Sequence, residues 1–85
     1  MPILSFFYGI IIRMNWRDHN PPHIHVEYQD NKVIIGLDGE IIEGKMPKKQ
    51  LRLVQAWMEL HRDEVEANWK LAQNKDELYK IAPLK

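Results

Sequence analysis

The first half of the chain alternates between apolar and polar positions. From position 10 to position 17 an apolar side chain recurs at every second residue, and Arg13, Asn15 and Arg17 lie between them. Side chains of a β-strand point alternately to its two faces, so this pattern predicts a strand with one apolar face and one basic, polar face.

Two further alternating segments, 23–29 and 32–37, are separated by Asp30 and Asn31. Both residue types tolerate positive φ angles, so the pair predicts a two-residue hairpin turn. The apolar face would then pair Tyr28 with Val33, Val26 with Ile35 and Ile24 with Leu37. The opposite face would pair Glu27 with Ile34, His25 with Gly36 and His23 with Asp38. A second turn signal, Asp38-Gly39, predicts a short fourth strand at 40–43.

From Pro47 onwards the apolar residues recur at helical spacings of three and four, through Leu51, Val54, Met58, His61, Val65, Trp69 and Ala72. Proline is favoured in the first turn of a helix. A second apolar stripe, Leu53, Trp57 and Leu60, makes the apolar side wider than packing on one sheet requires. We therefore expect the helix to break near His61 or to contact a second subunit.

These patterns predict an α+β fold. Three or four antiparallel strands form a meander at about 6–44, and a long helix or helix pair at about 47–73 packs on one sheet face. An extended tail follows at 74–85. We expect residues 1–85 to form a single domain. A chain this short buries only about 60–65% of its unfolded surface, so its thin core favours a homodimer.

Composition narrows the function classes. The chain has no cysteine, which excludes disulfides, thiolate metal ligands and cysteine nucleophiles, and fits a cytoplasmic protein. Twelve basic residues balance twelve acidic ones, so only a local patch can attract an anionic partner. The apolar N-terminal segment is interrupted by Gly9 and Arg13, so we expect neither a signal peptide nor a membrane span.

Three of the four histidines lie within seven residues, in the block Asp18-His19-Asn20-Pro21-Pro22-His23-Ile24-His25-Val26. His23 and His25 would share a strand face, which suits a zinc site with an open fourth position. The third ligand would be His19 or His61, and Asp18 and Asp38 would orient the imidazoles. The alternative is that the strand histidines only form local hydrogen bonds.

A metal-free interpretation starts from the basic face. Arg13 would bind a phosphate group while His23 and His25 act as acid and base in RNA cleavage. Further ligand contacts would come from Trp16, Arg17, Asp18 and His19. Ile34 and Ile41 are expected on the same face, so a partner protein or a second subunit is the alternative occupant, and plain solvation is another.

Four segments resemble the bacterial family known as domain of unknown function 4160. They are Phe7-Tyr8-Gly9-Ile10, the block 18–26, Glu43-Gly44-Lys45-Met46-Pro47, and residues 57–69 with His61. The block 18–26 is the most specific of them. The resemblance implies a small cytosolic protein that forms half of a two-gene module, of toxin–antitoxin type, with another small protein. It implies no activity, cofactor or catalytic residue.

The leading hypothesis is therefore a component of such a module that acts through a face rich in histidine and arginine. That face would bind an anionic ligand, RNA or the partner protein. The alternatives are a zinc-type histidine cluster at His19, His23 and His25, and a metal-independent ribonuclease that uses His23 and His25. The sequence does not decide whether the protein is an enzyme.

Overall fold

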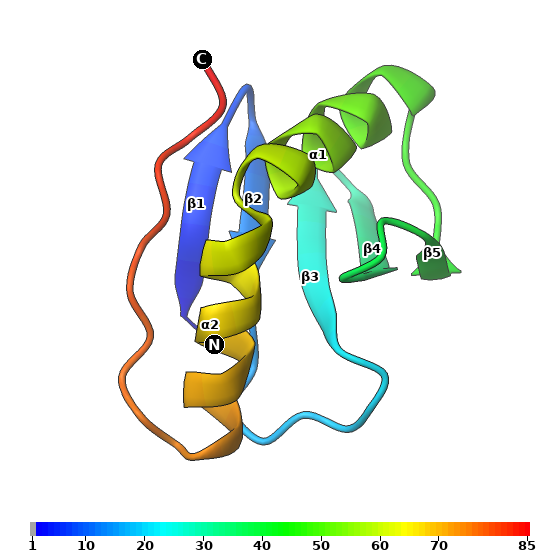
Figure 1. The fold of residues 1–85 in the computed structure, drawn as a ribbon. Coiled ribbons are helices and arrows are strands. Elements are labelled where there is room, and N and C mark those ends of the chain that lie inside the picture. The colour runs from blue at the N-terminus through cyan, green and yellow to red at the C-terminus, as the bar shows by residue number, and fades with distance from the viewer. Residues whose placement is uncertain (1) are drawn as a thin grey trace.

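The computed structural model describes residues 2–85 as one five-stranded antiparallel sheet followed by two helices (Figure 1). The strands lie side by side in chain order: β1 (Ile3–Phe7), β2 (Ile10–Arg13), β3 (His23–Tyr28), β4 (Asn31–Gly36) and β5 (Ile41–Gly44). The helices are α1 (Lys48–Leu60) and α2 (Arg62–Gln73). The predicted α+β meander with a helix pair is confirmed, with one strand more than expected.

The additional strand is β1, which pairs with β2 through a turn at Tyr8 and Gly9. Both turn residues have positive φ angles, 48° and 78°. The segment before this turn is almost entirely apolar, so it lacks the alternation that revealed the other strands. The predicted strand at 10–17 was wrong beyond Arg13, because the chain leaves the sheet there and Arg17 adopts a left-handed φ of 51°.

The β3–β4 hairpin turns one residue earlier than predicted. Its turn residues are Gln29 and Asp30, so Tyr28 pairs with Asn31. Gln29 takes the left-handed conformation, with φ 53°, and the Asn31 side chain donates to the Tyr28 carbonyl at 3.2 Å. The predicted pairing is therefore shifted by two residues. His23 pairs with Gly36, Ile24 with Ile35, His25 with Ile34, Val26 with Val33 and Glu27 with Lys32.

The predicted faces survive this error, because side chains repeat every two residues along a strand. Ile24, Val26, Val33 and Ile35 are all buried on one face. One face assignment was wrong: Ile41 pairs with core-facing Ile35, owing to a register shift between β4 and β5. Of the two isoleucines expected on the opposite face, only Ile34 is there.

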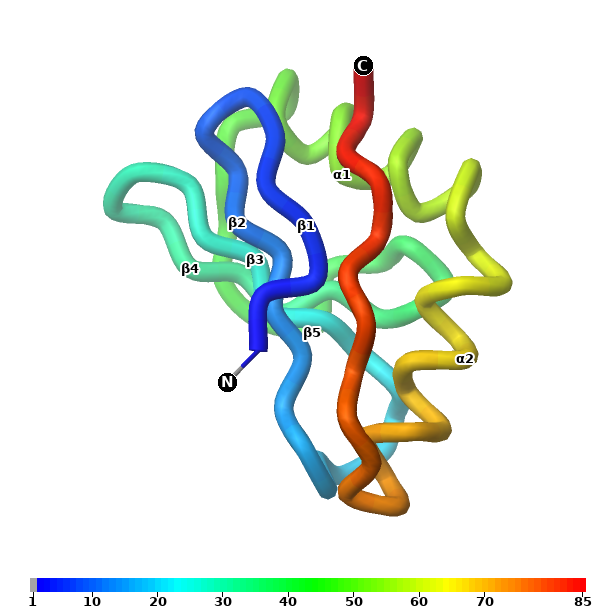
Figure 2. The backbone as a smooth tube through the Cα atoms, turned by 90° about the vertical axis from the view of Figure 1, so that its left-hand side faces the viewer, coloured from blue at the N-terminus to red at the C-terminus, as the bar shows by residue number. Residues whose placement is uncertain are grey.

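Both helices pack on the same face of the sheet (Figures 1 and 2). The helical part of the core consists of Val54, Trp57, Met58, Val65, Trp69 and Ala72. The helix breaks at His61, as expected, and the His61 ring nitrogen Nδ1 lies 2.8 Å from Glu64 Oε1. The other face of the sheet has no covering layer among residues 2–85.

The segment after α2 runs in extended form beside β1 (Figures 1 and 2). The Ile81 N–H donates to the Leu4 carbonyl at 2.8 Å, and the Trp57 indole donates to the Ala82 carbonyl at 2.8 Å. The buried Asn68 side chain bonds to both backbone groups of Tyr79, at 3.0 and 3.1 Å. These contacts attach the segment to both layers of the fold.

Candidate functional site

The loop of residues 14–22 brings the histidine block together. Its ends belong to β2 and β3, and its middle is attached to the end of α2. The Arg17 N–H donates to the Ala72 carbonyl at 3.0 Å, and Trp16 Nε1 donates to the Asp76 carbonyl at 2.9 Å. The Gln73 side chain donates to the Asp18 carbonyl at 3.3 Å. These bonds fold the loop back, so that Asp18 lies over the start of β3.

The Asp18 carboxylate contacts all three histidines of the block. Its Oδ2 lies 2.8 Å from His23 Nε2 and 3.0 Å from His25 Nε2. Its Oδ1 accepts from the His19 backbone N–H at 2.9 Å and lies 2.8 Å from His19 Nδ1. The Asn15 amide donates to Oδ2 at 3.3 Å. We call these five residues, Asn15, Asp18, His19, His23 and His25, the Asp18 cluster.

The hydrogen bonds keep Asp18 ionised. Partial burial acts to raise the pKa of its carboxyl group, but the hydrogen bonds from His25, His19 and His23 together outweigh that effect. The pKa of Asp18 therefore lies well below its usual range.

The three histidines differ in access to solvent. The His23 side chain is 3% exposed, that of His25 is 22% exposed and that of His19 is 84% exposed. The His23 ring lies against the ring of Trp69 from α2, with centroids 5.5 Å apart, and its Nδ1 is 2.7 Å from the Pro21 carbonyl oxygen. A substrate-sized ligand from solvent can thus reach His19 and His25, whereas the His23 ring is enclosed.

The uncovered side of the sheet is a separate surface that begins at His25. Arg13 is the β2 neighbour of His25, and its Nε donates to Glu27 Oε2 at 2.9 Å. Glu27 pairs with Lys32 on β4, and Ile34 pairs with Glu43 on β5. We call this surface the outer face; it comprises Phe6, Ile11, Arg13, His25, Glu27, Lys32, Ile34 and Glu43.

The outer face is less basic than the sequence predicted. Its two cations, Arg13 and Lys32, are matched by the carboxylates Glu27 and Glu43. Arg17, which was expected to add positive charge, lies in the loop next to α2 instead. A shallow hollow of about 220 Å³ beside His25 is lined by both carboxylates and by Lys32. The predicted cationic patch is therefore a surface of mixed charge.

The Asp18 cluster does not include the predicted residues Trp16, Arg17 and His61. Trp16 is exposed and bonds to Asp76, just after α2, while Arg17 bonds to Ala72 of α2. His61 belongs to the helical layer, where its ring lies 5.7 Å from that of Trp57. The four histidines therefore do not converge on one point.

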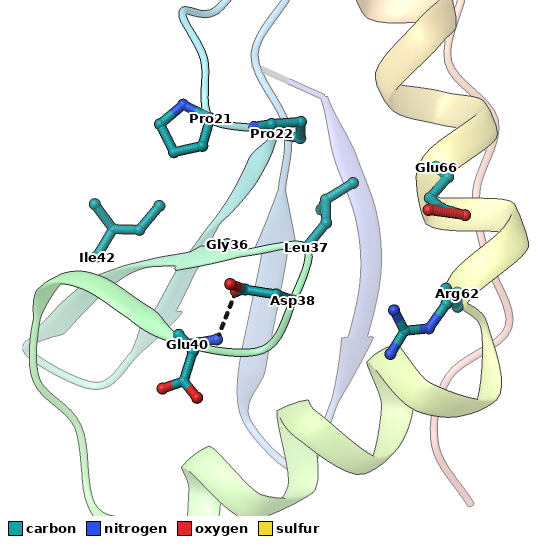
Figure 3. Close-up of a pocket in the computed structure, with 9 residues that line it drawn as sticks. All are labelled: Pro21, Pro22, Gly36, Leu37, Asp38, Glu40, Ile42, Arg62 and Glu66. Carbon is teal, nitrogen blue, oxygen red and sulfur yellow. Dashed lines mark hydrogen bonds between the residues drawn. The ribbon is translucent and has the colours of Figure 1, made fainter.

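A second hollow, of about 380 Å³, lies between Pro21-Pro22, the β4–β5 loop and the start of α2 (Figure 3). Arg62 and Glu66 of α2 face Asp38 and Glu40 across it, and Asp38 accepts a hydrogen bond from the Glu40 N–H at 2.9 Å. No residue of the Asp18 cluster lines this hollow. The hollow adjoins the same proline loop as the Asp18 cluster, but no ionisable group of the cluster lines it.

Sequence reasoning missed the contributions of Asn15 and Glu27. Asn15 was assigned only to a strand face, although it bonds to Asp18. Glu27 is the ion-pair partner of Arg13, which a correct alignment of β2 with β3 would have indicated.

The fold and the cluster define a small α+β protein with a partly buried aspartate–histidine centre at one end of an open sheet. The family described as Domain of unknown function (DUF4160) matches residues 9–70, more than half of the chain, and the protein belongs to this family. Searches of curated proteins and of solved structures gave no significant match. Neither helix among the described residues has the length and apolar character needed to cross a membrane.

Proposed function

We propose that the protein is the partner-binding half of a two-gene module of toxin–antitoxin type, and that its outer face binds the second protein. The observation that carries the proposal is a five-stranded sheet with both helices on one side and apolar side chains on the open side. The proposal places the pair in the cytoplasm, where a cysteine-free chain needs no oxidising environment.

The apolar part of the outer face favours a macromolecular occupant. Phe6 on β1 is 60% exposed, and Ile11 on β2 and Ile34 on β4 are partly exposed. Covering a large apolar side chain fully contributes roughly 1.5–3 kcal/mol, so even three partly exposed side chains give a partner substantial binding energy.

The charges favour a protein over RNA. A polyphosphate backbone would meet Glu27 and Glu43 as well as Arg13 and Lys32. Arg13 already bonds to Glu27, so its binding to phosphate competes with an existing ion pair. A protein surface can match alternating charges one by one, which gives specificity in its orientation.

The same geometry gives less support to phosphodiester cleavage by His23, His25 and Arg13. His23 is enclosed, and both of its ring nitrogens lie within hydrogen-bonding distance of oxygen atoms. A general acid or base must reach the proton that it transfers, directly or through one water molecule. Only His25 of the two is accessible to a substrate.

The test is co-expression with the small protein encoded beside this one, followed by size-exclusion chromatography with light scattering. Ile34→Asp places a charge on the outer face. We expect this substitution to weaken the complex at least about tenfold, because losing one buried apolar contact costs about 1.4 kcal/mol or more, and about 1.4 kcal/mol is a tenfold change in affinity. Leu60→Asp is the matched control, because Leu60 is 70% exposed but lies on α1 in the opposite layer.

Thermal unfolding followed by circular dichroism shows whether each variant is folded. A complex that tolerates Ile34→Asp, or that is equally weakened by Leu60→Asp, contradicts the proposal. A homodimer formed through the outer face, with no affinity for the second protein, would assign the face to a second copy and would also overturn the proposal.

A further inference from the structure

Asp18, His23 and His25 bring three metal-ligating side chains to one point. One ligand atom of each lies within 4.8 Å of those of the other two. From this convergence we propose that the three side chains bind a divalent transition-metal ion, such as Zn²⁺. The inference rests on the Asp18 cluster alone and is independent of the partner proposed for the outer face.

The hydrogen bonds of His23 point to a cation beside its ring. Nδ1 lies 2.7 Å from the Pro21 carbonyl oxygen, which can only accept, so Nδ1 carries a proton. Nε2 lies 2.8 Å from Asp18 Oδ2. A ring nitrogen without a proton and a carboxylate oxygen are both metal-ligating atoms. A metal ion held between Nε2 and Oδ2 would therefore bond to both atoms, while Nδ1 keeps its bond to Pro21.

The contacts around the three ligands are those that metal sites use. Metal-bound histidine commonly donates its other ring N–H to a backbone carbonyl, as His23 does to Pro21. The second oxygen of Asp18 is held by the His19 N–H and lies 2.8 Å from the His19 ring. Trp69 packs against His23 and restricts the rotation of its ring. The ligand atoms are thereby oriented before any ion arrives.

The distances are close to those that a bound ion needs. Zinc bonds of about 2.0–2.1 Å in tetrahedral geometry place the ligand atoms about 3.3 Å apart. Asp18 Oδ2 lies 2.8 Å from His23 Nε2 and 3.0 Å from His25 Nε2. These two separations need to widen by only about 0.3–0.5 Å, and the ligand atoms of the two histidines lie within 4.8 Å of each other.

The set of ligands also indicates that one coordination position of the ion would remain open. Two imidazoles and one carboxylate are three protein ligands, so a fourth position remains for water or another ligand. His25 is the more exposed histidine of the two, so this position is reached from the outer face. Nitrogen and oxygen ligands suit zinc and neighbouring divalent ions, and His19 is not needed as the third ligand that the sequence suggested.

The test is calorimetric titration of Zn²⁺ into the full chain, purified without a polyhistidine tag. We expect one equivalent to bind wild type, and Asp18→Asn and His25→Gln to weaken binding by at least about tenfold, since even residues that only support a ligand cost 10–100-fold when changed. His61→Gln is the matched control, because His61 bonds to Glu64 in the other layer.

Wild type without stoichiometric binding overturns the proposal, as does a loss of affinity in His61→Gln equal to that in His25→Gln. Unfolding curves in a chelator check that every variant is folded. Should Asp18→Asn unfold, His25→Gln still decides, since its side chain is partly exposed. The visible absorption of added Co²⁺ gives a second measurement, and an unchanged spectrum in His25→Gln also contradicts the proposal.

Discussion

At the scale of single residues, Asp18 shows what a sequence motif can and cannot predict. The block 18–26 indicated where chemistry should be sought, and the alternation of β3 correctly placed His23 and His25 on one side. The sequence suggested that Asp18 orients the imidazoles, but not that its carboxylate contacts all three histidines. That position depends on hydrogen bonds between the loop and Ala72, Gln73 and Asp76. Contacts between segments so distant in sequence leave no periodic signal.

Asp18 makes the stability of the metal-free protein depend on pH. Its pKa is lowered in the folded state, so the stabilisation is complete above its ordinary value near 3.8 and is lost as the pH falls further. We expect the free energy of unfolding, measured with urea in a chelator, to fall more steeply below about pH 4 in wild type than in Asp18→Asn. At pH 7 the variant should be about 1–3 kcal/mol less stable. Parallel pH profiles would contradict this role.

At the scale of elements, the alternation of side chains along a strand and the register between two strands have different origins. The faces of β3 and β4 follow from alternation, which the sequence shows directly. The register follows from the turn, and the Asp30-Asn31 pair was the better match to residues that tolerate positive φ. Gln29 takes that conformation instead, at φ 53°. The preference of Asp and Asn for positive φ angles therefore does not set the turn. The observed register instead pairs Glu27 with Lys32 and lets the Asn31 side chain donate to the Tyr28 carbonyl.

Glycine substitutions distinguish the two registers. Gln29→Gly removes the strain of a side chain at positive φ and should raise the free energy of unfolding by about 0.5–1 kcal/mol. Asp30→Gly is the control, since Asp30 is not among the described residues with positive φ, and it should lower stability or leave it unchanged. Urea unfolding measures both. Stabilisation by Asp30→Gly and not by Gln29→Gly would support the turn predicted from sequence.

At the scale of the whole molecule, periodicity predicted the meander, the helix pair and the break at His61. It did not predict β1, nor that Arg13 is paired with Glu27 so that the open face is of mixed charge. The mixed charge is the reason why we propose a partner protein, and not RNA, as the ligand of the outer face. His25 belongs both to the outer face and to the Asp18 cluster, so a bound partner would lie against the proposed metal centre.

The most direct test of the outer face is its footprint in solution. The unlabelled partner is added to this protein, which carries isotope-labelled methyl groups, and the NMR signals of those methyl groups are followed. We expect the methyl signals of Ile11 and Ile34 to shift or broaden, while those of Leu60 on α1 stay unchanged. Shifts at Leu60 with unchanged signals from Ile11 and Ile34 would contradict this expectation, because the partner would then bind the helical layer.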